Sequence, residues 1–336
     1  MEIENTDDAY KNLINRISEI YAQGQKEAVL AVNRHLVETY WRIGQHLVEF
    51  EQGGKVKAPY GKALLETLST DLTVLHGKGF SRSNLNYMRL FYQLYPICET
   101  VSHKLSWSHI CELVKIDDLS ERSFYEKQTV LENWSIRELK RQKNTSLFVR
   151  LALSKDKAGV SELAKKGQSL QQPADILREP YVFEFLKIPE NSRLSETQLE
   201  QKLMDHLQSF LLELGKGFTF VGRQYRITLS NEHYYVDLVF YHRILRCFVL
   251  VDLKIRKVRH YDIGQMNMYL GYFANEQNIE GDNPPIGIIL THEKDELLVE
   301  YAMYGMNSQL FVQKYQLYLP DREELRALIE KHLLVG

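Results

Sequence analysis

Residues 234–254 read YYVDLVFYHRILRCFVLVDLK, and this stretch decides how the C-terminal half of the chain is expected to fold. It consists of two apolar runs, Tyr234–His242 and Leu245–Lys254, joined by the short link Arg243-Ile244. Apolar runs of this length, rich in valine and aromatic residues, are typical of buried strands, and the short link predicts an antiparallel hairpin. Each run contains one aspartate, Asp237 or Asp252, and a buried carboxylate is costly unless it is paired or binds a metal.

The two aspartates are expected to lie side by side on neighbouring strands. Residues two apart in a strand share a face, so Asp252 and Lys254 point the same way. In register, Asp237 and Asp252 can converge on one cation, with Lys254 beside it. Two converging carboxylates suit Mg²⁺, and a lysine near the metal can stabilise the charge that develops on a phosphate. The alternative is a buried Asp–Lys ion pair with a structural role.

The sequence around the hairpin predicts the order helix, three strands, helix, strand. Ser195-Glu-Thr-Gln198 fits a capping box that opens a helix of about twenty residues, which Gly215 ends. The first of the three strands is expected over Phe218–Leu229. A helix near 261–274, a buried strand over Ile286–Leu290, a weaker strand at 309–313 and a final helix after Pro320 are expected to follow.

The N-terminal half is predicted to be helical. Helical spacing of apolar residues occurs over 25–50 and 64–75, Ser81 is a candidate helix cap, and shorter helices are expected near 106–115, 119–132 and 135–143. Those three short helices fit a helix-turn-helix or winged-helix-like unit. Residues 152–178 have a linker-like composition. We therefore expect an α+β chain of two domains, with a mainly α-helical N-terminal domain over 1–175, a linker from about 152, and an α/β domain with a central mixed sheet over 176–336.

The overall composition is that of a globular protein without membrane segments. Hydrophobic residues make up 44% and charged residues 26%, and every apolar run is far shorter than the roughly 20 residues that a membrane span needs. The acidic N-terminus does not resemble a signal peptide, and the three cysteines form no close pair. We expect a cytoplasmic protein with no membrane partner.

The net charge of −2 conceals two basic segments. Lysine and arginine number 42 against 44 aspartates and glutamates, yet residues 137–166 hold 9 basic and 3 acidic side chains, and residues 241–260 hold 6 and 1. Charges act within a screening length of roughly 10 Å, so a chain that is neutral on average can still bind a phosphate backbone locally. The composition does not exclude a nucleic-acid partner.

This order of motifs resembles the PD-(D/E)xK nuclease superfamily and, over nearly the whole chain, the YhcG family. In the C-terminal half the matching stretches are Leu199-Glu200, Phe210-Leu-Leu-Glu-Leu-Gly215, Phe220-Val-Gly-Arg-Gln224, Asp237-Leu-Val-Phe-Tyr241, Asp252-Leu-Lys254 and Gly264-Gln-Met-Asn-Met-Tyr269. In the N-terminal half they are Tyr40-Trp-Arg-Ile-Gly44, Gly79-Phe-Ser81, Asn84-Leu85, Leu105-Ser-Trp-Ser-His109 and Trp134-Ser135. The resemblance implies a restriction-endonuclease-like C-terminal fold. One departure is Asp252-Leu-Lys254, where the family usually has Glu-Leu-Lys, and the shorter side chain could alter the metal geometry.

The resemblance also implies a set of metal ligands. Superfamily members often place a glutamate of the first helix at the metal, and Glu200 is the matching position, with Glu196 and Glu213 as rivals. The implied site therefore holds Mg²⁺ or Mn²⁺ with Glu200, Asp237 and Asp252, and the Leu253 carbonyl is a further candidate ligand. Lys254 would assist the attacking water.

Two residues of the following helix are implied to support catalysis. Gln265 and Tyr269 are four apart and so share a helical face. They resemble the Gln-xxx-Tyr element of RecB-like nucleases, which orients the catalytic core and contacts nucleic acid. The alternative for both residues is ordinary helix packing.

Polar residues near these motifs are the expected contacts to nucleic acid. One group lies in the matching stretches or directly follows the Asp252 strand, and a second lies on and just after the predicted helix 135–143. The two groups are Arg223, Gln224, Arg256, Lys257 and Arg259, and Arg137, Lys140, Arg141 and Lys143. Each cation could neutralise a phosphate, whereas a solvated surface is the alternative.

Taken together, the motifs predict a Mg²⁺-dependent nuclease that hydrolyses phosphodiester bonds, with DNA favoured over RNA. The helical domain would bind nucleic acid or mediate assembly into a homo-oligomer, and the family context suggests bacterial genome defence or mobile-element biology. A second hypothesis is a non-cleaving nucleic-acid-binding or assembly module on a nuclease-like fold, motivated by Asp252 in place of glutamate. A third is a structural or partner-binding protein with no nucleic-acid role.

Overall fold

The computed structural model describes residues 3–52, 63–97, 104–153, 157–189, 192, 194–319 and 323. The chain divides into two compact units, residues 1–140 and 141–336, and the division falls within helix α6. All of the strands in the described residues belong to the second unit, which agrees with the expected α+β organisation. None of the described helices combines the length and the apolar character that crossing a membrane requires.

The first unit consists of helices, as the hydrophobic spacing predicts. They are α1 (Ile3–Gln52), α2 (Leu64–His76), α3 (Arg82–Leu94), α4 (Trp107–Leu113), α5 (Leu119–Glu132) and the start of α6 (Ile136–Asn144). Ser81 caps α3 by accepting a hydrogen bond from the Asn84 N–H, and Ser135 accepts one from the Glu138 N–H at the start of α6. The prediction that Ser81 caps a helix is confirmed.

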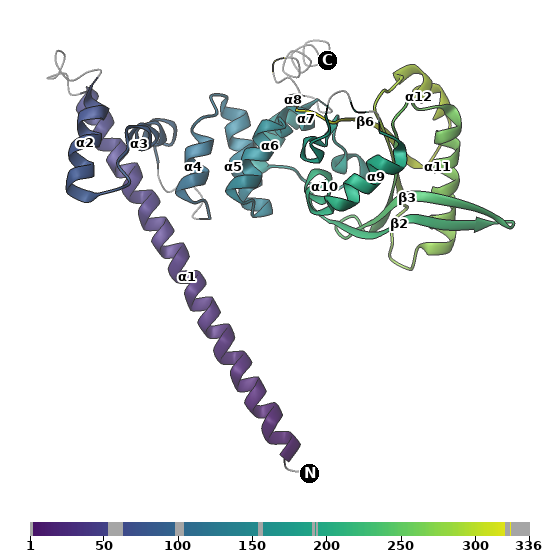
Figure 1. Cartoon of the computed structure of the whole chain (residues 1–336), viewed down its shortest axis with the longest axis horizontal. Helices are drawn as coiled ribbons and strands as arrows, with labels where there is room; N and C mark the ends of the chain where they lie inside the picture. Colours follow the sequence, from purple (N-terminus) through teal and green to yellow (C-terminus); the bar gives the residue numbers. More distant parts are fainter. Residues whose placement is uncertain are drawn as a thin grey trace. The chain divides into compact units, whose positions relative to one another are not determined.

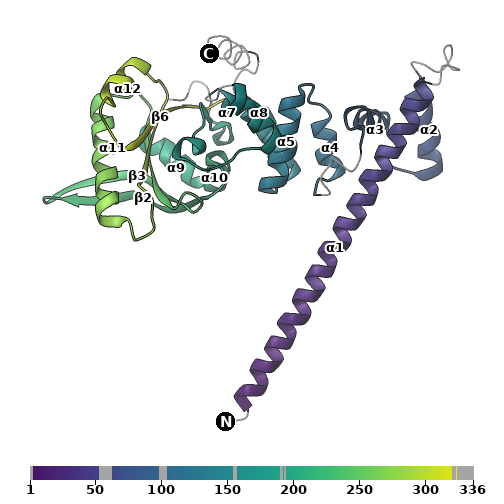
Figure 2. The ribbon, with the colours of Figure 1, turned by 180° about the vertical axis from the view of Figure 1, so that it is seen from behind.

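Helix α1 is much longer than the predicted helix over 25–50. Its C-terminal part packs on α3, where Gly44 permits a close approach because a Cβ at this position would lie 2.0 Å from the Met88 carbonyl oxygen. The N-terminal part of α1 extends beyond the other helices of this unit (Figures 1 and 2) and is exposed from residue 10 to residue 32. No proline interrupts α1, so the helical backbone continues past its packed part.

The second unit is built on a six-stranded mixed sheet in the order β1-β6-β5-β4-β3-β2. The strands are β1 (Tyr181–Val182), β2 (Phe218–Leu229), β3 (Glu232–His242), β4 (Cys247–Lys254), β5 (Ile286–Thr291) and β6 (Gln309–Gln316). Strands β2, β3 and β4 are antiparallel neighbours, whereas β4, β5, β6 and β1 run parallel. The predicted mixed sheet and the predicted strands β2 to β6 are confirmed.

Helices pack on both faces of this sheet around two buried clusters. One cluster joins α9 (Glu196–Asp205) and α10 (Leu207–Leu214) to the sheet, and its members include Leu203, Phe210 and Val251. The other joins α11 (His260–Tyr272) and α12 (Glu296–Ala302) to the opposite side and includes Leu250 and Met266. Two helical layers therefore exclude water from the strands that bear the two aspartates.

The structure differs from the predicted elements in several places. The single helix predicted after Ser195 is divided at His206 into α9 and α10, although the capping box at Ser195 is confirmed. The expected linker contains the end of α7 (Leu147–Ala152), α8 (Lys157–Lys166) and the 3₁₀ turn Pro173–Ile176, and it buries Leu163 and Ile176. The predicted helix after Pro320 lies outside the described residues apart from residue 323. The proposed domain boundary near 175 stays a prediction.

Candidate active site

Asp237 and Asp252 lie next to each other on the antiparallel strands β3 and β4. Leu238 pairs with Val251 in the sheet register, and the same register continued by one residue places Asp237 opposite Asp252. The Leu253 N–H donates a hydrogen bond of 2.8 Å to Asp237 Oδ2, which holds this carboxylate against the β4 backbone. The convergence expected from the sequence is therefore present.

Lys254 occupies the same buried corner of the sheet. Its Nζ lies 2.5 Å from Asp252 Oδ2 and 3.9 Å from Glu196 Oε2 of α9. Asp252 and Lys254 are only 6% and 8% exposed, so their ion pair is largely shielded from water. Glu196, a rival for the role assigned to Glu200, thus contacts Lys254 rather than the two aspartates.

Glu200 reaches the site from α9 through Gln224 of β2. Gln224 Nε2 donates to Glu200 Oε2 at 2.6 Å and to Asp237 Oδ1 at 3.2 Å, so one amide group bridges the two carboxylates. Gln224 has a φ of 46° and lies just past a register shift between Phe220 and Gly222, an irregularity that can redirect a side chain. Arg223 Nε lies 3.2 Å from Glu200 Oε1.

Burial and repulsion from Asp237 raise the pKa of two of these carboxyl groups, Asp252 and Glu200. Burial and the neighbouring Asp237 together raise the pKa of Asp252 to about 7, despite the opposing effect of Lys254. Burial also raises the pKa of Glu200, and the charge of Asp237 adds to the rise. Burial lowers the pKa of Lys254, but the Asp252 carboxylate overcomes this effect and the net pKa is raised. At neutral pH the Lys254 side chain is therefore a cation.

The two aspartates fit a divalent metal ion better than the full set of three carboxylates does. Asp237 and Asp252 are adjacent, and a divalent cation between them would favour the ionised form of Asp252, whose pKa is raised. Glu200 Oε1 is a buried oxygen without a hydrogen bond, but Arg223 Nε already lies 3.2 Å from it. The Gln224 amide also separates Glu200 from Asp237, and the described residues contain no group of three or more His, Cys, Asp or Glu side chains gathered as a metal site.

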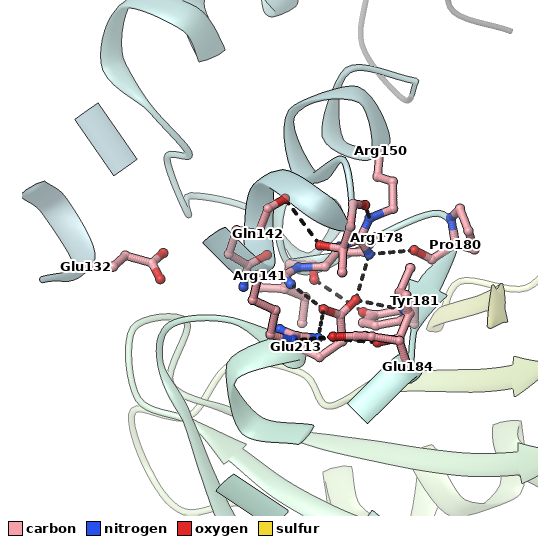
Figure 3. Close-up of polar contacts among 12 residues, drawn as sticks. Glu132, Arg141, Gln142, Arg150, Arg178, Pro180, Tyr181, Glu184 and Glu213 are labelled. Carbon is pink, nitrogen blue, oxygen red and sulfur yellow. Dashed lines mark hydrogen bonds and ion pairs between the residues drawn. The ribbon is translucent and has the colours of Figure 1, made fainter. Parts of the chain in front are cut away.

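Glu213, the second rival, lies in a separate buried ionic cluster. Figure 3 shows Arg141, Arg150 and Arg178 converging on this carboxylate, with nitrogen–oxygen distances of 3.0, 2.6 and 3.3 Å. Its side chain has no exposed surface. Burial acts to raise the pKa of Glu213, but the three arginines outweigh it and hold the pKa at about 2. These three ion pairs give Glu213 a structural role in the buried cluster.

Gln265 and Tyr269 connect α11 to strand β3. Gln265 Nε2 donates to the Tyr269 hydroxyl at 2.5 Å, and this hydroxyl donates to the Tyr235 carbonyl oxygen at 3.0 Å. Tyr235 is two residues before Asp237, so the chain of hydrogen bonds positions the backbone that bears this carboxylate. Burial and then Asp252 raise the pKa of Tyr269, which stays a hydroxyl donor.

Comparisons with known proteins identify a family for each half of the chain. A family model described as "YhcG PDDEXK nuclease domain" matches residues 174–330, and a model described as "DUF1016 N-terminal domain" matches residues 16–150. The protein "Putative nuclease YhcG" of Escherichia coli (strain K12) is 36% identical over 354 residues, covering 96% of this chain and 94% of that protein. The chain belongs to the YhcG family. Its C-terminal half is a nuclease domain of the PD-(D/E)xK type, which makes the protein an enzyme.

Two solved structures show a weaker likeness to this member of the YhcG family. A repair endonuclease from Pyrococcus abyssi matches with a TM-score of 0.27 and 17% identity, covering 39% of this chain and 50% of that one. EndoMS in its apo form matches with a TM-score of 0.24 and 14% identity, covering 39% and 49%. The match thus spans about half of each of these proteins, and the family assignment rests on the family models and the E. coli relative.

The basic residues that follow β4 are mostly engaged with neighbouring side chains. Arg256 forms a two-pronged ion pair with Asp262, at 2.7 and 2.8 Å. Lys257 pairs with Asp295 at 2.8 Å, although its side chain is 53% exposed. Arg259 is exposed at the start of α11. Lys257 and Arg259 therefore keep surface that a phosphate could reach.

The basic residues of α6 have different surroundings. Arg137 is exposed, and Lys140 is exposed beside Glu112 at 3.6 Å. Arg141 contacts Glu184 and Glu213, and only 15% of its side chain is exposed. These ion pairs account for the position of Arg141 without any contact to nucleic acid. Lys143 is half-buried. Arg137 and Lys140 remain as candidate contacts, and we leave Arg141 out of the proposed interface.

Gln224 is the residue whose contacts the sequence analysis missed. The sequence predicts a contact to nucleic acid at Gln224, whereas its amide bonds to two of the candidate metal ligands. No pattern in the sequence marks the positive φ that turns Gln224 toward them.

Proposed function

We propose that this nuclease depends on Mg²⁺ or Mn²⁺ and hydrolyses phosphodiester bonds, in DNA rather than RNA. The observation that carries the proposal is the pair of adjacent carboxylates on β3 and β4 with a lysine ammonium at their side. Asp237 and Asp252 would hold the ion, and Glu200 and the Leu253 carbonyl are further candidate ligands. The family to which the chain belongs supports the nuclease activity itself.

A divalent ion bound here would neutralise phosphate charge and lower the pKa of a water molecule. In the net reaction the water oxygen forms a bond to phosphorus while one ester P–O bond breaks. One proton ends on the leaving oxygen and the other water hydrogen stays on the new phosphate monoester. The residues of the chain bind, orient and stabilise charge during this exchange.

Lys254 would act as a charge-stabilising group. Its ammonium is held beside Asp252 and is a cation at neutral pH, so it can face the negative charge that develops on the phosphate oxygens. Gln224 would orient Glu200 and Asp237 through its two hydrogen bonds. Gln265 and Tyr269 would act indirectly, because their hydrogen bonds position the strand that carries Asp237.

The test is cleavage of single- and double-stranded DNA and RNA by the full chain, in Mg²⁺ or Mn²⁺ and in EDTA. We expect Asp237→Asn and Lys254→Met to lower the cleavage rate at least about a hundredfold, as loss of a charge-stabilising group typically does. Matched controls are Asp282→Asn and Lys216→Met. Asp282 accepts a hydrogen bond from Tyr241 near the C-terminal end of β3, and Lys216 lies on the exposed loop before β2. Full activity in Asp237→Asn or Lys254→Met, or in EDTA, would refute the mechanism. A rate on RNA above that on DNA would refute the DNA preference.

One observation favours a second function, a non-cleaving nucleic-acid-binding or assembly module. The ammonium group of Lys254 already lies 2.5 Å from Asp252, a side chain shorter than the glutamate usual in the family. Calorimetric titration with Mn²⁺ separates the two functions. Salt-sensitive DNA binding without metal binding or cleavage would favour the second function.

The first unit is proposed to mediate assembly or to bind nucleic acid through residues such as Arg137 and Lys140. Assembly is supported by the exposed part of α1, where large apolar side chains recur at helical spacing. Among them Ile14 is 45%, Ile17 57% and Tyr21 67% exposed. Such a stripe can pair with the same stripe of a second copy.

Light scattering after size exclusion tests this assembly. We expect a dimer that Ile17→Asp converts to a monomer, while Asn15→Asp on the opposite side of α1 has no effect. A monomer at micromolar concentration in the unchanged protein would refute the pairing.

A further inference from the structure

Strands β2 and β3 extend past the rest of the sheet as a two-stranded arm, defined here as residues 225–236. Strand β4 pairs with β3 only from Leu238 to His242, so the arm residues pair only with each other. Figures 1 and 2 both show this arm projecting beyond α11. Ser230 and Asn231 form its tip, and both have positive φ, as a tight hairpin turn requires.

The two faces of the arm differ in burial. On one face, Ile227 and Val236 are fully buried and belong to the same cluster as α11. Tyr225 packs on this side as well, and its hydroxyl donates to Gln277 at 2.8 Å. The alternate residues form the other face and are exposed, namely Arg226, Thr228, His233 and Tyr235. Packing against α11 therefore fixes the arm and leaves one polar face open.

This open face leads to the candidate active site. Tyr235 lies two residues before Asp237 on β3, so the exposed part of the arm ends within two residues of this carboxylate. The Tyr235 backbone is itself held by the Tyr269 hydroxyl, at 3.0 Å. A chain lying along the arm would therefore pass Tyr235 directly before it reached Asp237.

The open face pairs a free cation with an exposed aromatic ring. Arg226 lies opposite Tyr235 in the strand register, and Thr228 lies opposite His233. Tyr235 is 47% exposed although it is an aromatic residue on a strand. Within the described part of the chain, the side chain of Arg226 has neither an ion pair nor a hydrogen bond. A guanidinium group binds phosphate. An exposed aromatic ring on a strand can stack on a base only where no neighbouring base already covers that base, as in a single strand.

We propose that the open face of the arm, centred on Arg226 and Tyr235, binds unpaired nucleotides beside the scissile phosphate. Tyr235 stacks on a base, and Arg226 contacts a backbone phosphate. The inference rests on the proposed function and specifies its substrate as nucleic acid with a single-stranded segment at the point of cleavage. It predicts that the enzyme prefers single strands, flaps or frayed ends to a continuous duplex.

The experiment measures binding and cleavage separately. Binding of a labelled single-stranded DNA oligonucleotide and of the matching duplex is measured by fluorescence anisotropy, with the full chain carrying Lys254→Met to prevent cleavage. Tyr235→Leu and Arg226→Gln are added to this background, and cleavage is measured without it. Matched controls are Tyr304→Leu, at a tyrosine that is 90% exposed after α12, and Arg243→Gln, at an exposed arginine beyond the other end of β3.

We expect Tyr235→Leu to weaken single-strand binding about tenfold, the loss typical of one stacked base, and duplex binding less than twofold. Arg226→Gln should reduce the salt dependence of single-strand binding by about 0.7 in the log–log slope, the effect of one phosphate contact. Because both side chains are exposed, the unfolding temperature should not change.

Two results would overturn the inference. In the first, the unchanged protein binds and cleaves, and Tyr235→Leu and Arg226→Gln bind single strands as tightly as the control variants do. The other is an equal loss of duplex binding in Tyr235→Leu, which would exclude stacking on an unpaired base. If the unchanged protein neither bound nor cleaved any nucleic acid, the proposed function itself would fail together with the inference.

Discussion

Replacing Glu213 by alanine should strongly destabilise the second unit. This buried carboxylate accepts hydrogen bonds from Arg150 at 2.6 Å, from the Val182 N–H at 2.9 Å, from Arg141 at 3.0 Å and from Arg178 at 3.3 Å. The arginines come from the segments around α6, α7 and β1, whereas Glu213 comes from α10, so one side chain joins four parts of the fold (Figure 3).

The expected loss can be estimated in two ways. Removing one partner of a buried ion pair typically costs about 3–5 kcal/mol, because charge is left buried without compensation. Independently, the pKa of Glu213 falls from 4.5 to about 2 on folding, which corresponds to about 3 kcal/mol of stabilisation. We therefore expect a loss of about 4 kcal/mol, which lowers the unfolding temperature of this unit by roughly 10 °C.

The positions of the tryptophans make the assay specific to one unit. Trp41, Trp107 and Trp134 all lie in the first unit, so their fluorescence reports its unfolding, whereas circular dichroism also follows the sheet of the second. Urea unfolding of Glu213→Ala should show an earlier transition by circular dichroism and an unchanged tryptophan transition. Glu276→Ala, at an exposed glutamate, is the control and should stay within about 0.5 kcal/mol.

The pH dependence follows from the same shift. Because the folded pKa lies below the unfolded value, the stabilisation is complete above about pH 5 and is lost as the pH falls from 4.5 towards 2. In Glu213→Ala this part of the acid sensitivity should be absent. A Glu213→Ala protein within 1 kcal/mol of the unchanged protein at pH 7 would refute the reasoning, as would a shift confined to the tryptophan transition.

Three further predictions concern packing and boundaries. Gly44→Ala should destabilise the first unit by about 2 kcal/mol in tryptophan-monitored unfolding, because the new Cβ meets the Met88 carbonyl oxygen; unchanged stability would contradict the close approach. Tyr269→Phe should lower the cleavage rate with little change in substrate affinity, because the hydroxyl holds the strand of Asp237; equal rates would show that this hydrogen bond is dispensable. A fragment of residues 141–336 should be more stable in urea than one of 176–336, which lacks two of the arginines that pair with Glu213; equal stability would support the domain boundary near 175 instead.

Local sequence patterns predicted the elements that carry the site. Apolar runs bounded by turn residues located β2, β3 and β4 to within two residues, and capping boxes located the start of α9. A short hairpin between two regular strands restricts the register, because side chains alternate and the connection is short. The pairing of Asp237 with Asp252 and the position of Lys254 therefore follow from the local sequence.

The tertiary structure decided which charged residues serve the site and which serve the fold. Glu200 and Glu213 lie on consecutive helices and both were candidates for the metal, yet the three arginines that surround Glu213 lie 35 to 72 residues away in the chain. The same holds for Arg141 and Gln224, whose partners come from distant segments. Hydrophobic periodicity and capping act between near neighbours and are visible in a sequence. Ion pairs and buried hydrogen bonds depend on which segments the packed core brings together, and so they appear only in the folded chain.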